Sequence, residues 1–276
     1  MSGLLKQEWL RLRTLRSTWV LSGLSLAVTL LAATALTLTA ASRAAAGPAG
    51  RLPGASPLGS QRDFASVLAS TTQLTPLLMG LLGVLAFGHE YRYGIIRLTL
   101  TTVPGRTSVA AARLLGVALW ATAVGIVCVA ASGLVLAVLG RGRFAPGVGV
   151  GVAPTGRIIV GAVLYIVLFA LVGLALGSLL RNVPAAISLL FVLPLLAEPI
   201  VLGLLSIPAL DRFAGAGRFL PFHAGQQLTA FDTAVQRGVP AGFQTDLSPL
   251  AGGLTFALVT AALLAVALVL FRRRDA

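Results

Sequence analysis

Few residues of this chain are of a type that can do chemistry, and Glu198 is the acidic residue that lies within an apolar run. It occurs in the segment LPLLAEPIV (193–201), where Pro194 and Pro199 flank it. If an apolar helix begins near Ala185, Glu198 is about 13 residues into it, or roughly 20 Å at 1.5 Å per residue. A charge at that depth in a bilayer is costly, which makes Glu198 a candidate for a substrate pathway. The alternative is that the helix ends early and that Glu198 lies at the outer surface.

A second group of polar residues lies in the segment FGHEYRYGIIRLTL (87–100). In a helix, Glu90, Gly94 and Arg97 share one face, because Gly94 and Arg97 follow Glu90 by four and seven residues. Gly94 has no side chain and would let another backbone approach closely. A short helix with these properties suits the docking of a soluble partner. An ordinary charged helix end is the alternative, and composition alone favours it.

The sets of residues that define common enzymes are missing from the sequence. The phosphate-binding loop G-x-x-x-x-G-K-[ST] needs a lysine, but Lys6 is the only lysine and no such glycine pattern precedes it. The two histidines, His89 and His223, are far apart in the sequence, and neither H-E-x-x-H nor G-x-S-x-G occurs. We therefore predict no catalytic residue, metal ligand or cofactor site, and expect that the chain is not an enzyme.

Composition places the chain in a membrane. Hydrophobic residues make up 57% of its 276 residues and charged residues only 11%, whereas soluble domains carry about a quarter charged residues. The mean hydropathy is +0.94. The net charge of +13 is of the kind found at the ends of membrane helices, where it meets anionic head groups. There is no basic domain with interspersed aromatic residues, so nucleic acid is not an expected partner.

Apolar runs of about 20 residues predict six membrane-spanning helices in a single all-α transmembrane domain, residues 1–276. Because these runs do not alternate in polarity, they exclude a β-barrel. The expected spans are about 19–40, 67–88, 114–139, 158–180, 185–207 and 250–271. Residues 1–18 precede them as a basic amphipathic helix, of the kind that lies in the membrane interface. Residues Arg181, Asn182 and Pro184 predict a tight turn between the fourth and fifth spans.

Three further residue patterns concern packing. Glu8 falls within the apolar arc of the first helix, where it either pairs with Arg11 one turn later or is a surface charge at the edge of that arc. Gly173 and Gly177 form a G-x-x-x-G pair, which usually brings two membrane helices close together. Cys128, the only cysteine, is expected to be a small packing residue.

Six spans place both termini on one side of the membrane. With the N-terminus inside, 12 of the 21 basic residues lie inside, including those of the first helix and the arginines at 272–274. Short loops and the first helix dominate the positive-inside rule. Both termini are therefore expected in the cytoplasm.

Several segments resemble, in the same order, the type-two exporter-like family of ABC transporter permeases. KQEWLRLRTLRSTW (6–19) is similar to the family's N-terminal interfacial helix, and FGHEYRYG with LTLTTVPGR (98–106) is similar to the segment after its second span. LPFHAGQQL (220–228) resembles its external segment between the fifth and sixth spans, and LVLFRRRDA (268–276) resembles its C-terminus. No single motif is specific, but their common order covers nearly the whole chain.

The resemblance implies a function and a set of partners. The chain would be the permease subunit in a bacterial plasma membrane, forming the translocation pathway together with a second copy or a paralogue. ATP and magnesium would bind to a separate ATPase subunit. The resemblance also implies a coupling helix after the second span, which assigns ATPase docking to Glu90, Arg92, Gly94 and Arg97, and more weakly to Glu8. Export of a hydrophobic or amphipathic substrate follows from the family alone.

Two other functions are compatible with the sequence. A secondary transporter or channel would work without a partner, but it would favour several buried charges, and only Glu198 is a candidate. An intramembrane enzyme is disfavoured by the missing catalytic residues. The sequence identifies no substrate.

Overall fold

The computed structural model describes residues 2–45, 68–69, 73–93, 106–140, 155–230 and 247–274, and this part of the chain is helical without any strand. The longer helices are α1 (Ser2–Thr14), α2 (Arg16–Ala45), α4 (Thr75–Tyr93), α6 (Arg106–Leu139), α7 (Thr155–Leu180), α8 (Val183–Val192), α9 (Glu198–Leu205) and α11 (Pro249–Arg274). The shorter elements are the π-helix η2 (Leu193–Ala197), the 3-10 helices η3 (Pro208–Phe219) and η4 (Gln227–Thr229), and α10 (Pro221–Gln226).

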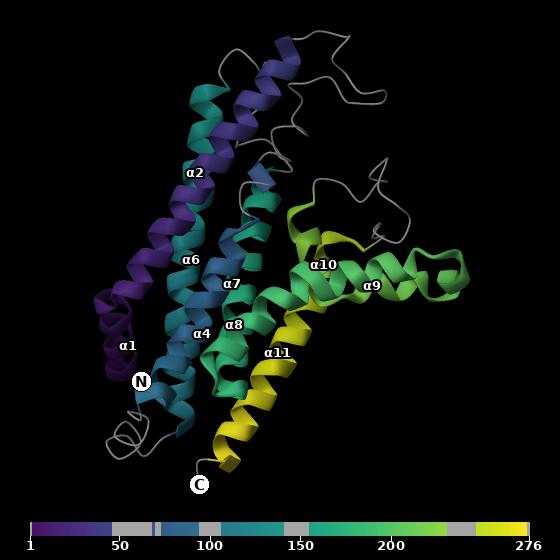
Figure 1. Ribbon diagram of the computed structural model, residues 1–276. Coiled ribbons are helices and arrows are strands. Elements are labelled where there is room, and N and C mark those ends of the chain that lie inside the picture. Colours follow the sequence, from purple (N-terminus) through teal and green to yellow (C-terminus); the bar gives the residue numbers. More distant parts are fainter. Residues whose placement is uncertain are drawn as a thin grey trace.

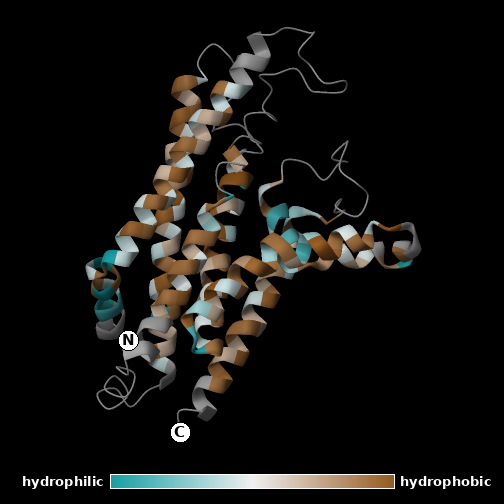
Figure 2. Cartoon of the chain, in the orientation of Figure 1, coloured by the Kyte–Doolittle hydropathy of each residue, from teal (hydrophilic) through white to brown (hydrophobic). Residues whose placement is uncertain are grey.

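Helices α2, α4, α6, α7 and α11 form a bundle, and both termini lie at one end of it (Figure 1). Helix α7 occupies the centre and packs against α4, α6 and α11. Apolar residues cover most of the bundle, whereas hydrophilic residues occur mainly on α1 and around α10 (Figure 2). Helix α1 lies beside the lower part of the bundle and contacts α6 and α2.

Five segments are long and apolar enough to cross a bilayer. They are Arg16–Thr39, Ser108–Leu139, Thr155–Leu180, Val183–Leu205 and Pro249–Leu270. These helices are those of a multi-pass membrane protein, and they correspond to five of the six predicted spans. The predicted span 67–88 overlaps α4, but part of that range lies outside the described residues, so the sixth span stays a prediction.

The predicted fifth span is not a straight helix. Between α8 and α9 the chain forms η2, in which the Glu198 N–H donates to the carbonyl of Leu193, five residues earlier. Pro194 and Pro199 have no N–H and cannot make the regular hydrogen bonds of an α-helix, so they favour such an irregularity. Beyond it, α9 and η3 project sideways from the bundle (Figure 1).

The predicted turn between the fourth and fifth spans is confirmed. Helix α7 ends at Leu180 and α8 begins at Val183, with only two residues between them. Arg181 has a φ of 52°, in the left-handed region, which reverses the chain direction. The Asn182 side chain then caps α8 by accepting a hydrogen bond from the Ala185 N–H at 3.3 Å.

The G-x-x-x-G prediction is also confirmed. A Cβ atom at Gly173 would overlap the backbone carbonyl of Gly80, and one at Gly83 would overlap that of Ala170. A Cβ atom at Gly177 would lie 2.7 Å from the Val84 carbonyl oxygen. Helices α4 and α7 therefore touch backbone to backbone, and glycine is required at these positions.

Candidate functional site

Glu8 is the predicted docking residue whose environment the structure defines in most detail. Its carboxylate accepts hydrogen bonds from Arg11 Nη1 at 3.3 and 3.4 Å, and from Arg113 Nη2 at 3.3 Å. The pairing with Arg11, one turn later on α1, was one of the two sequence predictions for Glu8 and is confirmed. The Glu8 side chain is only 13% exposed, so it is not a surface charge.

Arg113 is the member of this site that sequence reasoning missed. It lies on α6, its side chain is 2% exposed, and its guanidinium lies over the Phe87 ring at 4.5 Å from the centroid. In the sequence, Arg113 comes just before an apolar run, as many arginines at helix ends do. The signal that could have identified it is the carboxylate of Glu8, which needs a counter-charge once it faces the bundle.

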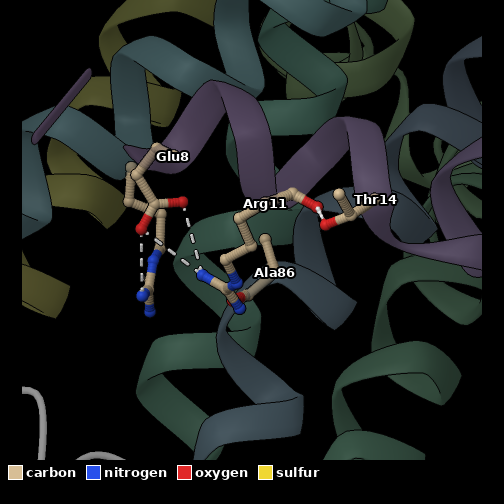
Figure 3. A network of polar contacts seen from close by, with 5 residues as sticks. Glu8, Arg11, Thr14 and Ala86 are labelled. Atoms are coloured by element: carbon tan, nitrogen blue, oxygen red, sulfur yellow. Dashed lines mark hydrogen bonds and ion pairs between the residues drawn. The ribbon is translucent and has the colours of Figure 1, made fainter. Parts of the chain in front are cut away.

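The three charged side chains join three helices. Arg11 Nη2 donates to the Ala86 carbonyl of α4 at 2.9 Å, which adds α4 to the contact between α1 and α6 (Figure 3). We call Glu8, Arg11 and Arg113 the ionic cluster. One carboxylate and two guanidinium groups leave it with a formal charge of +1. Such a cluster cannot activate a nucleophile, but it fixes the position of α1 against the ends of α4 and α6.

The ionic cluster lies close to the predicted coupling segment. Glu90 follows Ala86 by four residues, or about 6 Å along the helix axis. Glu90 and Arg92 belong to the last turns of α4, although their side chains are outside the described part of the structure. Gly94 and Arg97, and with them the predicted coupling helix, lie outside the described residues altogether. Their role in docking stays a prediction.

Glu198 lies in a different part of the molecule, at the start of α9 (Figure 1). It is 7% exposed, and its two oxygens accept hydrogen bonds from the backbone N–H groups of Phe222 at 2.8 Å and His223 at 2.7 Å. These N–H groups belong to the first turn of α10, whose N-cap residue Leu220 has no acceptor side chain. Glu198 therefore replaces the missing cap and ties α9 to α10.

An aromatic cluster holds α10 in place. The Phe222 ring lies 5.0 Å from that of Phe169 on α7 and 5.5 Å from that of Phe256 on α11, measured between centroids. Tyr165 lies 5.5 Å from Phe256. The carboxylate of Glu198 is thus held where α9, α10 and the bundle meet. The structure shows this contact with α10, and it leaves the predicted role in a substrate pathway untested.

Within the described ranges, no group of three His, Cys, Asp or Glu residues is arranged to hold a metal ion. No protein-family model matches this chain, and no curated protein is recognisably similar to it in sequence.

Proposed function

We propose that this chain is the membrane-spanning permease subunit of an ABC transporter. It would form the translocation pathway and dock a separate ATPase subunit, in the bacterial plasma membrane and with both termini in the cytoplasm. The multi-pass helical structure and the lack of a phosphate-binding lysine support this proposal. A membrane protein of this kind must obtain its energy from another source.

The observation that carries the proposal is the ionic cluster. It connects α1 to α4 and α6 at the end of the bundle where both termini lie. The segment that follows α4 is the one expected to bind the ATPase. A partner that pushes on this segment would act at once on three helices, because Glu8, Arg11 and Arg113 hold them together. This is the mechanical property that ATPase-driven transport requires.

In the proposed complex, ATP and magnesium bind only to the ATPase subunit. Their binding and hydrolysis would shift the permease between inward-open and outward-open states. A second copy of the chain, or a paralogue, would supply the other half of the pathway. Many large apolar side chains are exposed on α2, α6, η2 and α9, including Leu31, Leu134, Leu195 and Ile200. These surfaces are available to lipid and to a second permease chain. The transported compound is expected to be hydrophobic or amphipathic.

Co-purification tests the docking. The chain is expressed together with an ATPase encoded by a neighbouring gene, and the complex is isolated through a tag on the chain. Glu90→Arg combined with Gly94→Leu should abolish the complex, because it reverses a charge and closes the site of backbone approach. Glu198→Gln is the matched control, since α9 is far from the end of α4 (Figure 1). It should keep the complex and reduce transport. An intact complex with the double variant would contradict the coupling-helix assignment.

Reconstitution tests the energy source. The purified chain alone in liposomes should not move any solute uphill, and transport should require the ATPase and ATP. Uphill movement by the chain alone would replace the proposal with a secondary transporter, in which the buried acid Glu198 would be the first candidate for ion coupling.

Labelling of a single cysteine tests the orientation. Cys128 is fully buried, so an added Ala276→Cys should be the only site that reacts with a membrane-impermeant maleimide. Reaction in inside-out vesicles, and not in intact cells, is the expected result. The reverse pattern would place the C-terminus outside.

A further inference from the structure

A groove of about 560 Å³ opens on the outer face of the bundle between α1, α2 and α6. Its walls include Trp9, Trp19 and Trp120, which are all three tryptophans of the chain. We call it the tryptophan groove. Its volume is in the range of sites that hold small-molecule ligands. It lies on the opposite side of α1 from the ionic cluster's contact with α4, and the proposed docking of an ATPase does not depend on it.

The three indole rings are held in fixed positions. The Trp120 ring lies 5.5 Å from that of Trp9 and 5.6 Å from that of Trp19, between centroids. Trp19 Nε1 donates to the Arg13 carbonyl at 2.7 Å, and Trp120 Nε1 donates to Ser22 Oγ at 3.1 Å. Trp19 is 56% exposed and Trp9 is 41% exposed, so parts of both rings are open to the surroundings. The groove is thus preformed and lined by exposed aromatic surface.

The polarity of the groove changes along the helix axes. Arg13, the tryptophans and Ser22 line one end, and apolar residues such as Leu26 and Val127 line the other. Leu26 follows Trp19 by seven residues, and Val127 follows Trp120 by seven, so each apolar position is about 10 Å further along its helix. A cationic and aromatic end followed by an apolar end is complementary to one amphiphile with an acidic head and a hydrocarbon tail.

The charge near the polar end is positive. Lys6, Arg13 and Arg16 are exposed in this region. Glu8 is the only acidic residue among the first 62 residues of the chain, and its carboxylate is bound by Arg11 and Arg113. The negative charge of Glu8 is therefore balanced within the ionic cluster and does not neutralise the exposed cations. Basic residues at a membrane surface attract anionic lipids, and arginine matches the geometry of a phosphate.

We propose that the tryptophan groove is a binding site for one anionic phospholipid of the adjacent leaflet. The phosphate lies at Arg13, at the level where tryptophans line membrane interfaces. One acyl chain follows the groove past Gly23 toward Leu26 and Val127. A zwitterionic lipid lacks the net charge that the exposed cations favour, and it binds more weakly.

Intrinsic fluorescence tests this directly, because every tryptophan of the protein lies in the groove. The full chain is placed in nanodiscs that contain increasing fractions of brominated phosphatidylglycerol or brominated phosphatidylcholine, and quenching is measured. The expected result is a saturable component that appears at a lower fraction of phosphatidylglycerol than of phosphatidylcholine. Quenching that rises only in proportion to the brominated fraction, or that saturates equally for both lipids, would overturn the proposal.

Two variants locate the site. Arg13→Gln should raise the half-saturating fraction of phosphatidylglycerol about fivefold, the effect of one basic residue at a membrane surface. Gly23→Leu should remove the saturable component, because a Cβ atom at Gly23 meets no atom within 4 Å and the added side chain therefore fills the groove. Both positions are exposed, so both variants are expected to fold, and thermal unfolding checks this independently.

Matched controls make the same changes elsewhere. Gly203→Leu adds the same side chain on α9, where a Cβ atom also meets nothing within 4 Å. Arg212→Gln removes an exposed arginine from η3. Neither control should alter the quenching curve. If Gly23→Leu leaves lipid quenching unchanged and instead converts a dimer to a monomer, a second copy of the chain covers the groove, and the proposal is wrong.

Discussion

Glu8→Gln should destabilise the protein far more than the loss of an exposed charge. The change keeps the shape of the side chain but removes the negative charge beside Arg113, whose side chain is 2% exposed. Breaking a buried ion pair by removing one partner costs about 3–5 kcal/mol. The lower end applies here, because the Glu8 side chain is 13% exposed and its contacts are 3.3–3.4 Å long. We therefore expect Glu8→Gln to lower the free energy of unfolding by about 3 kcal/mol.

The measurement is thermal unfolding of the purified chain in detergent. For a chain of this size, a loss of 1 kcal/mol lowers the Tm by about 2–4 °C, so Glu8→Gln should lower it by about 6–12 °C. Lys6→Gln is the matched control, since Lys6 lies on the same helix and is exposed. Lys6→Gln should change the free energy of unfolding by no more than about 0.5 kcal/mol.

A double-mutant cycle separates the ion pair from other effects. Arg113→Met retains much of the apolar volume at this buried position and removes the cation. The double variant Glu8→Gln with Arg113→Met should lose less free energy of unfolding than the two single variants together. The coupling energy between the two positions should be at least about 1.5 kcal/mol. A Tm shift for Glu8→Gln no larger than that of Lys6→Gln, or additive effects within about 0.5 kcal/mol, would refute a buried ionic cluster.

Three further changes test other parts of the fold. Gly173→Ala should destabilise the protein by about 3 kcal/mol, because the new Cβ meets the backbone of α4, while Gly156→Ala on the same helix should be tolerated in the same thermal assay. Glu198→Ala should leave the two first-turn amides of α10 without their acceptor and speed their hydrogen exchange at least about tenfold, without a similar change in α2. Burial lowers the pKa of His223, so the unfolded chain takes up a proton more readily and stability should fall as the pH drops below about 6.5. In His223→Gln this part of the pH dependence should be absent.

Features set by short stretches of sequence were predictable. The apolar runs that became α2, α6, α7 and α11 need only length and composition. The turn at Arg181 and Asn182, the pairing of Glu8 with Arg11, and the close approach at Gly173 depend on residues a few positions apart. The first two have a local physical cause, whereas the glycine pair predicted a close approach without identifying α4 as the partner helix.

Features that join distant segments were not predictable. Arg113 is separated from Glu8 by 105 residues, and nothing in its own neighbourhood distinguishes it from other helix-end arginines. Glu198 finds its hydrogen-bond donors 24 and 25 residues later, in the backbone of α10. Backbone donors carry no signature in the sequence. A buried acid could therefore be identified as unusual, but its partners could not be named.

The bend at η2 falls between these two cases. Pro194 and Pro199 flank Glu198 in the sequence, and proline interrupts the hydrogen bonds of an α-helix, so an irregularity close to Glu198 has a local cause. Its direction was not predictable, because it depends on how α9 packs against η3 and how Glu198 attaches to α10. Proline identifies where hydrogen bonds are lost, and tertiary contacts decide where the chain then goes.

The backbone contact between α4 and α7 has a mechanical consequence. Where two helices are separated by side chains, a change of rotamer can absorb a small displacement, but at Gly83 and Gly173 there is no side chain to rearrange. We therefore expect the two helices to tilt and translate together. A displacement applied at Tyr93, the end of α4, should then be passed on to α7. Spin labels on these two helices should keep a constant separation in every state of the protein, whatever distance α11 moves.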